Sequence, residues 1–157
     1  MIFVTIGMHS IGFDRLIIKM DEISPNLDEK IIMQIGNSGY IPKNTEYFRL
    51  KTYPQIKKIC KKARVIVAHG GTGSVITALK QNTPIITIPR IKEYGEVIDD
   101  QQMDFVKAME KKTLVIPIYD LDNLENILKE NKFNNKSVKK DDKLVNSVIN
   151  YIITLKE

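Results

Sequence analysis

The sequence predicts an α/β domain built on a doubly wound parallel sheet. Short runs rich in Val and Ile alternate along the chain with longer segments whose apolar residues recur at helical spacing. Strands that are apolar throughout are typical of a parallel sheet covered by helices on both faces. With 157 residues, 43% of them apolar, the chain suits one domain with a full core.

The first half of the chain predicts three extended segments and two helices. The first two apolar runs each end at a glycine, and the second helix carries Pro54 in its first turn, where a missing N–H is tolerated. The expected strands are residues 1–6, 30–36 and 45–53, and the expected helices are residues 13–23 and 53–63.

The second half continues the alternation, which predicts right-handed crossovers. The expected strands are residues 64–70, 83–90 and 113–118, and the expected helices are residues 72–82, 97–112 and 121–131. We therefore expect one α/β domain over residues 1–131. Residues 132–157 should form a basic loop and an amphipathic helix, whose stripe of Leu144, Val148, Ile149 and Ile152 packs either on the domain or on a partner.

Composition narrows the class of protein. The net charge of +5 suits an anionic ligand or membrane surface without choosing between them. The single cysteine, Cys60, excludes an internal disulfide and is expected in the core. The chain shows neither a basic leader nor an apolar run near the roughly 18 residues of a membrane span, so we expect a soluble, cytoplasmic protein.

The stretch HGGTGS, residues 69–74, carries the clearest chemical signal. Ligands of open α/β sheets bind beyond the carboxyl ends of the strands. Glycines there allow close backbone approach, and a helix beginning near Thr72 would aim free N–H groups at a diphosphate, with Thr72 and Ser74 adding hydroxyls. The loop lacks the lysine of Walker A, and Ile76 replaces the third glycine of the dinucleotide fingerprint. A tight turn without a ligand is the alternative.

Four linked motifs give this loop a context. They are VTIGMHSIGFDRLI, QIGNSGYIP, ARVIVAHGGTGSVITALKQNTPIITIPR and KEYGEVIDDQQ, in this order. Together they resemble the glycosyltransferase family 28 C-terminal domain, the nucleotide-sugar half of a GT-B enzyme. The sequence resembles in particular the short stand-alone members of bacterial exopolysaccharide and capsule synthesis and the catalytic subunit of the dolichol-pathway N-acetylglucosaminyltransferase.

The resemblance implies a set of donor-binding residues. The first loop would face the donor phosphates, the glycine loop would hold the diphosphate, the second strand end would line the nucleoside, and polar side chains near residue 100 would meet sugar and ribose hydroxyls. These residues are Gly7, Met8, His9, Gln34, Gly36, Gly70, Gly71, Thr72, Gly73, Ser74, Glu96, Asp100, Gln101 and Gln102. The pattern also departs from the family, because Thr77 stands where many members carry a ribose-binding glutamate, and Val97 and Gln101 stand where short members often carry histidine.

For several other polar residues, the sequence is compatible with either a ligand-binding role or a structural role. His9 and His69 are candidate catalytic residues that contact phosphate or sugar, or else hydrogen-bond neighbouring backbone. Arg90 could meet phosphate or form a surface ion pair with Glu93 or Glu96. A helix face of Lys57, Lys58, Lys61 and Lys62 would attract anionic lipid or would simply be solvated.

The resemblance implies an inverting transferase subunit that binds a UDP-sugar and needs no metal or other cofactor. It would transfer the sugar to a lipid-linked saccharide in exopolysaccharide or capsule synthesis. Since one α/β domain is half of a GT-B cleft, a separate membrane-anchored subunit should bind the acceptor and recruit this chain to the cytoplasmic face of the membrane. No nucleic-acid partner is expected. A non-catalytic UDP-sugar-binding regulatory module is the alternative, while a flavodoxin-like or NAD-binding domain would require a fingerprint that is absent.

Overall fold

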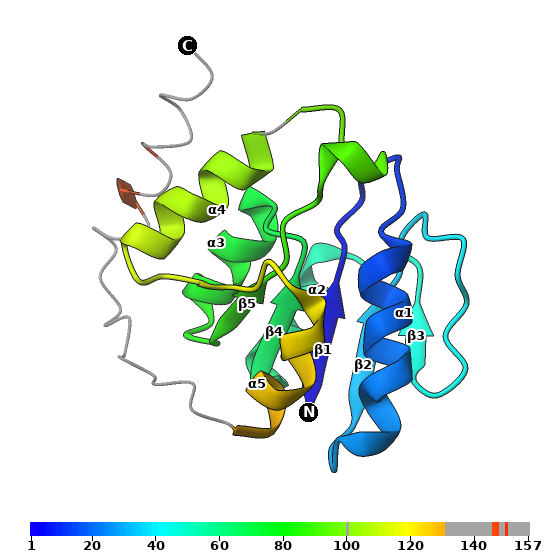
Figure 1. Cartoon of the computed structure of the whole chain (residues 1–157). Helices are drawn as coiled ribbons and strands as arrows, with labels where there is room; N and C mark the ends of the chain where they lie inside the picture. The colour runs from blue at the N-terminus through cyan, green and yellow to red at the C-terminus, as the bar shows by residue number, and fades with distance from the viewer. Residues whose placement is uncertain (100, 131–145, 148–149, 151–157) are drawn as a thin grey trace.

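The computed structural model describes residues 1–99, 101–130, 146–147 and 150 (Figure 1). The strands are β1 (Ile2–Thr5), β2 (Ile31–Gln34), β3 (Glu46–Phe48), β4 (Val65–Ala68), β5 (Ile85–Thr87) and β6 (Ile116–Pro117). The α-helices are α1 (Asp14–Ile23), α2 (Tyr53–Lys62), α3 (Thr72–Lys80), α4 (Gln101–Lys111) and α5 (Leu124–Glu130). Three single-turn helices complete the described elements: η1 (Ser24–Asn26), η2 (Lys92–Tyr94) and η3 (Leu121–Asn123).

The six strands form one sheet in the order β3-β2-β1-β4-β5-β6, and every pairing is parallel. From β1 the chain moves outward through β2 and β3, then returns to β4 on the other side of β1 and moves outward again. The sequence prediction of a doubly wound α/β sheet is confirmed. The direction of winding reverses between β1 and β4, which is where such sheets bind ligands.

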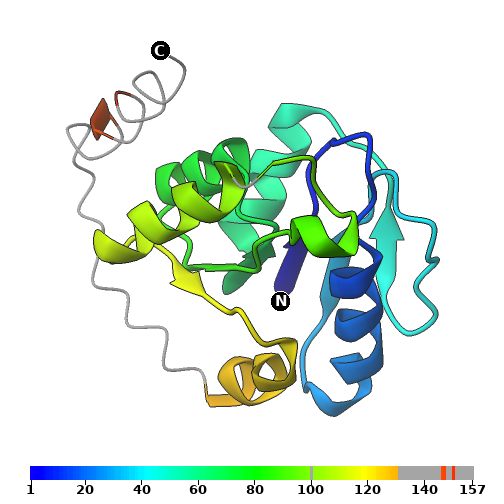
Figure 2. The ribbon, with the colours of Figure 1, turned by 45° about the horizontal axis from the view of Figure 1, so that its top comes forward.

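Helices cover both faces of the sheet, as Figure 2 shows, with α2, α3 and α4 on one side and α1 and α5 on the other. One apolar cluster joins α1 and α5 to strand residues such as Val4 and Val67. The other joins α2, α3 and α4 to alternate strand residues such as Phe3 and Ile66. Each inner strand is therefore buried on both faces, which explains its continuous apolar sequence.

The elements lie where the sequence placed them, and the differences are at their ends. The third extended segment is a three-residue edge strand, and the fourth helix begins at Gln101 rather than at Val97. The predicted C-terminal helix over residues 144–155 falls largely outside the described residues. Within the described part of the chain, no helix is both long and apolar enough to cross a membrane.

Candidate functional site

A cavity of about 440 Å³ opens at the carboxyl ends of β1 and β4, at the reversal point of the sheet. Its walls come from the β1–α1 loop, the end of β2, the first turns of α2 and α3, and the start of α4. The predicted site residues that line it are Gly7, Met8, His9, Gln34, His69, Gly71, Thr72, Gly73, Ser74 and Gln102. Residues that are distant in sequence are thus gathered around one opening.

The first turn of α3 provides hydrogen-bond donors at the mouth of this cavity. Gly71 is the N-cap and has no capping side chain, and the N–H of Val75 closes the first helical turn on its carbonyl at 3.1 Å. The preceding N–H groups of Thr72, Gly73 and Ser74 have no helical acceptor. A Cβ added at Gly73 would meet no atom within 4 Å, so the space beside this turn is open. The arrangement suits an anion, which the helix dipole would also stabilise.

His69 explains two of the glycines beside it. A Cβ added at Gly71 would lie 2.2 Å from His69 Nε2, and one added at Gly7 would lie 2.8 Å from His69 Cε1. The imidazole ring therefore occupies the volume that these two glycines leave free, and it joins the β1–α1 loop to the glycine loop. Gly71 has an ordinary φ of −68°, so its need for glycine comes from the ring and not from its backbone.

The protonation state of His69 follows from its surroundings. Its Nδ1 lies 3.4 Å from the carbonyl oxygen of Thr5, which can only accept, so Nδ1 carries the proton. Burial, reinforced by the nearby positive charge of Arg90, lowers the pKa of His69 to about 4. The ring is neutral at physiological pH, and its Nε2 lone pair lies on the Gly71 side. This geometry supports the second interpretation of His69, in which its ring hydrogen-bonds neighbouring backbone.

Two side-chain amides reach the cavity, one from strand β2 and one from helix α4. The Thr5 hydroxyl donates to Gln34 Oε1 at 2.6 Å and accepts from the Gly7 N–H at 3.2 Å. Gln34 is buried with its carbonyl side occupied, which leaves its NH₂ group to donate into the cavity. Across the cavity, Gln102 Oε1 is buried and has no hydrogen-bond partner among the described residues. This acceptor is suited to a ligand hydroxyl.

His9 and Met8 form the outer rim. His9 Nδ1 accepts a hydrogen bond from the Ile11 N–H at 3.1 Å, and the His9 carbonyl accepts one from Asn37 Nδ2 at 2.9 Å. The ring orders the loop through Nδ1 while it lines the opening. Met8 is 75% exposed at the same rim.

The inner part of the cavity is apolar and lies under α2 and α3. Phe3, Ile66 and Ile56 contribute to it, and Cys60 is buried there, where burial raises the pKa of its thiol to about 11. The prediction of a core cysteine is confirmed.

Thr77, at the position of the family's ribose-binding glutamate, donates its hydroxyl to the Gly73 carbonyl at 2.7 Å.

Several predicted site residues lie elsewhere. Gly36, with φ of +45°, shapes the end of β2, where a Cβ would lie 2.9 Å from the Gly7 carbonyl oxygen. Gly70, with φ of +79°, allows close packing against Val106 of α4. Gln101 is exposed and donates its backbone N–H to Asp99 Oδ1, and Asp100 is outside the described residues.

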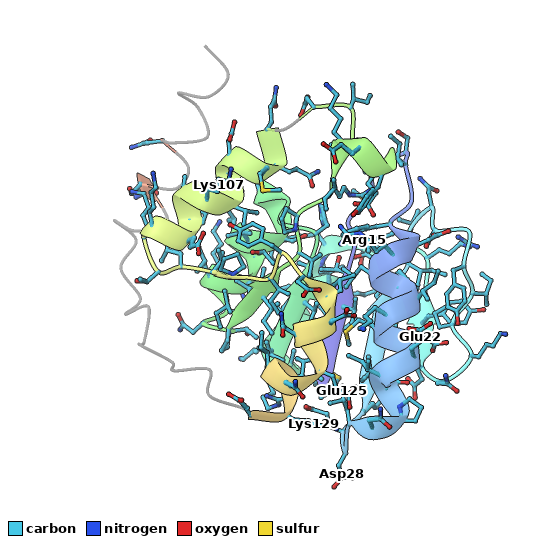
Figure 3. All side chains as sticks on the ribbon, viewed as in Figure 1. Arg15, Glu22, Asp28, Lys107, Glu125 and Lys129 are labelled. Atoms are coloured by element: carbon cyan, nitrogen blue, oxygen red, sulfur yellow. The ribbon has the colours of Figure 1, made fainter. Side chains whose placement is uncertain are left out.

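Glu96 does not line the cavity, because an arginine from α1 holds it. Arg15 Nε and Nη2 donate to the two Glu96 carboxylate oxygens at 2.7 and 2.9 Å, and the Ile91 N–H donates to Oε2 at 2.8 Å. Figure 3 places Arg15 at the end of α1 nearest the η2 segment. The predicted sugar-facing residue is thus part of a bidentate ion pair that joins α1 to the β5–α4 segment.

Arg90 is buried, which contradicts the predicted surface ion pair, and it does not line the cavity in which a phosphate would bind. It is 2% exposed, and its guanidinium donates to the carbonyl oxygens of Ile6, Ile11, Gly12 and Glu96 at 2.7 to 3.3 Å. It also stacks 4.9 Å from the centre of the Phe13 ring. Arg90 fastens the β1–α1 loop to the β5–α4 segment, which Figure 2 shows side by side.

The fold and the loop at its reversal point define a Rossmann-like domain of the GT-B type. The family model for the glycosyltransferase family 28 C-terminal domain matches residues 1–150, and the chain belongs to this family.

Relatives and solved structures agree with this family. The human UDP-N-acetylglucosamine transferase subunit ALG13 is 27% identical over 125 residues, which cover 71% of this chain and 10% of that protein. This chain thus spans about one tenth of the length of that relative. Among solved structures, the glycotransferase of kitacinnamycin superposes with a TM-score of 0.63 at 20% identity, covering 82% of this chain and 34% of the other. MurG of Acinetobacter baumannii gives 0.57 at 15% identity, covering 82% and 40%. These likenesses establish the shared fold.

Proposed function

We propose that this chain binds the donor of a glycosyltransferase reaction, a UDP-sugar, in the cavity between β1 and β4. The observation that carries the proposal is the open first turn of α3, which faces the same cavity as the amides of Gln34 and Gln102. The helix N–H groups would bind the diphosphate, and the amides would meet hydroxyl or carbonyl groups at its two ends. The name of the human relative supports UDP-N-acetylglucosamine as a donor to try first.

The proposed reaction is an inverting transfer by direct displacement. An acceptor hydroxyl attacks the anomeric carbon, the bond to the diphosphate oxygen breaks, and the leaving UDP keeps the electron pair. Negative charge then develops on the diphosphate, where the prearranged N–H groups of α3 would stabilise it. The general base for the acceptor would come from a partner, because His69 is buried and ordered by Thr5, and His9 orders its own loop.

We further propose that the acceptor is a lipid-linked saccharide of exopolysaccharide or capsule synthesis, bound by a separate membrane-associated subunit. The word "subunit" in the names of the human and mouse relatives supports a partner. The resemblance to the short family members of exopolysaccharide and capsule synthesis supports this type of biosynthetic pathway.

Titration with UDP and UMP tests the donor site. We expect UDP to bind at least about tenfold more tightly than UMP, since one charge-assisted hydrogen bond is worth about 1.5–3 kcal/mol. The substitution Gly73→Val should abolish this preference by filling the open space, while the protein stays folded because a Cβ at this position meets no neighbouring atom within 4 Å. Calorimetry gives both affinities, with Glu125→Val on α5, across the sheet, as the matched control. Equal affinities for UDP and UMP, or a preference that survives Gly73→Val, would refute the diphosphate site.

A non-catalytic UDP-sugar-binding module is the second candidate, because Thr77 replaces the glutamate and its hydroxyl is already bonded to Gly73. A transfer assay separates the two. The chain is incubated with labelled UDP-sugar and membranes from its own cells, with Gly73→Val as the inactive control. We expect label in the lipid fraction only when the membranes contain the partner. Donor binding without any transfer under these conditions would identify the regulatory module instead.

A further inference from the structure

The positive charge of the domain lies on one layer of helices. Helix α2 carries four lysines and α3 carries one, and neither helix has an acidic residue. Helices α1 and α5 on the opposite face together carry five acidic and three basic residues. Figure 3 shows Glu22 and Glu125 on that opposite side. Helix α4, in the same layer as α2 and α3, has two acidic residues and two lysines, so the two layers of helices carry net charges of opposite sign.

The lysines of α2 form one free cationic surface. Lys57, Lys58, Lys61 and Lys62 are all exposed, at a spacing that repeats after one helical turn, while Ile56, Ile59 and Cys60 face the core. None of the four forms an ion pair with a described residue. Glu46 of the preceding strand β3 is paired with Lys30 instead. Four uncompensated charges on one short helix repel one another, so an anionic surface would stabilise them.

Exposed apolar side chains continue this surface toward the cavity. Leu50 is 61% exposed and Tyr53 is 57% exposed, immediately before and at the start of α2. Lys51 lies between them, with its Nζ 4.7 Å from the centre of the Phe48 ring. Both Lys51 and Tyr53 also line the cavity. Basic residues beside an exposed tyrosine and leucine are the combination that binds the headgroup region of a bilayer.

We infer that α2 and the segment before it, residues 50–62, form a docking surface for an anionic lipid bilayer. Headgroup phosphates would pair with Lys57, Lys58, Lys61 and Lys62, and Leu50 and Tyr53 would enter the interface. This orientation places the mouth of the cavity next to the bilayer. Contact with lipid then comes from this domain itself, in addition to any membrane-anchored partner.

Vesicle binding of the full chain, without nucleotide or acceptor, tests the inference independently of the proposed function. We expect binding to vesicles of phosphatidylcholine and phosphatidylglycerol in equal parts, little binding to pure phosphatidylcholine, and weaker binding at high salt. Replacing Lys57, Lys58, Lys61 and Lys62 together by Gln should lower the affinity by about three orders of magnitude, given the contribution of each lysine near a charged membrane. Leu50→Ser with Tyr53→Ser should lower it at unchanged charge.

The matched control removes the same charge elsewhere, by Lys30→Gln, Lys43→Gln, Lys92→Gln and Lys129→Gln, and should keep the affinity within about threefold. Both quadruple variants should melt like the wild type, because the substituted side chains are exposed or half-exposed. The inference is overturned if the α2 variant binds anionic vesicles as the wild type does, or if both quadruple variants lose affinity equally. Binding to a soluble anionic polysaccharide but not to vesicles would overturn it as well.

Discussion

Replacing Arg90 by methionine should destabilise the protein by about 3–5 kcal/mol, a large part of the stability of a domain of this size. Methionine fills much of the same volume but donates no hydrogen bonds. Four carbonyl groups, those of Ile6, Ile11, Gly12 and Glu96, would lose their donor. Buried acceptors without partners are among the most costly defects in a folded protein. Arg90→Lys should be intermediate, because one ammonium cannot reach acceptors arranged around a planar guanidinium.

Urea unfolding of the two variants measures this effect, and Arg49→Met is the matched control. Arg49 also donates to backbone carbonyls, those of Gly36 and Ser38, but its residue is exposed and both acceptors lie in one loop after β2. Its replacement should cost about 1 kcal/mol. If Arg90→Met unfolds at the urea concentration of the wild type, Arg90 does not hold the two loops together.

Arg90→Met should also weaken donor binding under conditions in which the variant is still folded. The β1–α1 loop carries Gly7 and His9, and the β5–α4 segment leads to Gln102, and these lie on different walls of the cavity. Arg90 donates to the backbone of both segments, and the Arg15–Glu96 pair joins α1 to the second of them. Hydrogen exchange should therefore increase in both segments together in Arg90→Met.

The sequence predicted the sheet because each inner strand is apolar on both faces, a local pattern that tertiary contacts do not alter. It also predicted the glycine loop, since the residues that shape it and the helix that follows are consecutive. Arg90 and Glu96 could not be placed in this way. Their partners lie between 78 and 84 residues away, apart from the contacts within their own segment, and topology alone brings these together. A charged side chain near a ligand loop therefore looked like a ligand contact until its buried partners were known.

Within the site, the role of Gly7 also depends on a partner that is distant in sequence. A glycine after a first strand is common to many ligand loops, and its φ of +69° gives it one reason to be glycine. Its second reason is the ring of His69, which follows 62 positions later and is visible only once β1 and β4 are paired. The histidine and the glycines are thus one packing unit, which explains why an imidazole precedes the glycine loop.

This packing unit leads to the second large effect, expected for Gly71→Ala. The added Cβ would lie 2.2 Å from His69 Nε2, and the ring has little room to move because it is buried and Gly7 packs closely against the same end of it. Overpacking of this kind costs about 1–3 kcal/mol, and replacing an N-cap glycine by alanine adds up to about 1 kcal/mol. Gly73→Ala is the control in the same loop, since it meets no neighbour and should leave stability unchanged or slightly raised.

A double-mutant cycle with His69→Ala separates the clash from the loss of the N-cap glycine. In the His69→Ala background the ring is gone, so Gly71→Ala should cost only the N-cap contribution of about 1 kcal/mol or less. The difference between the two backgrounds, about 1–3 kcal/mol, is the coupling energy of the ring with Gly71. Thermal unfolding of the four proteins at neutral pH, where His69 is uncharged, provides the free energies. If Gly71→Ala costs the same with and without the ring, the glycine is retained for the helix start or the ligand, and His69 does not determine it.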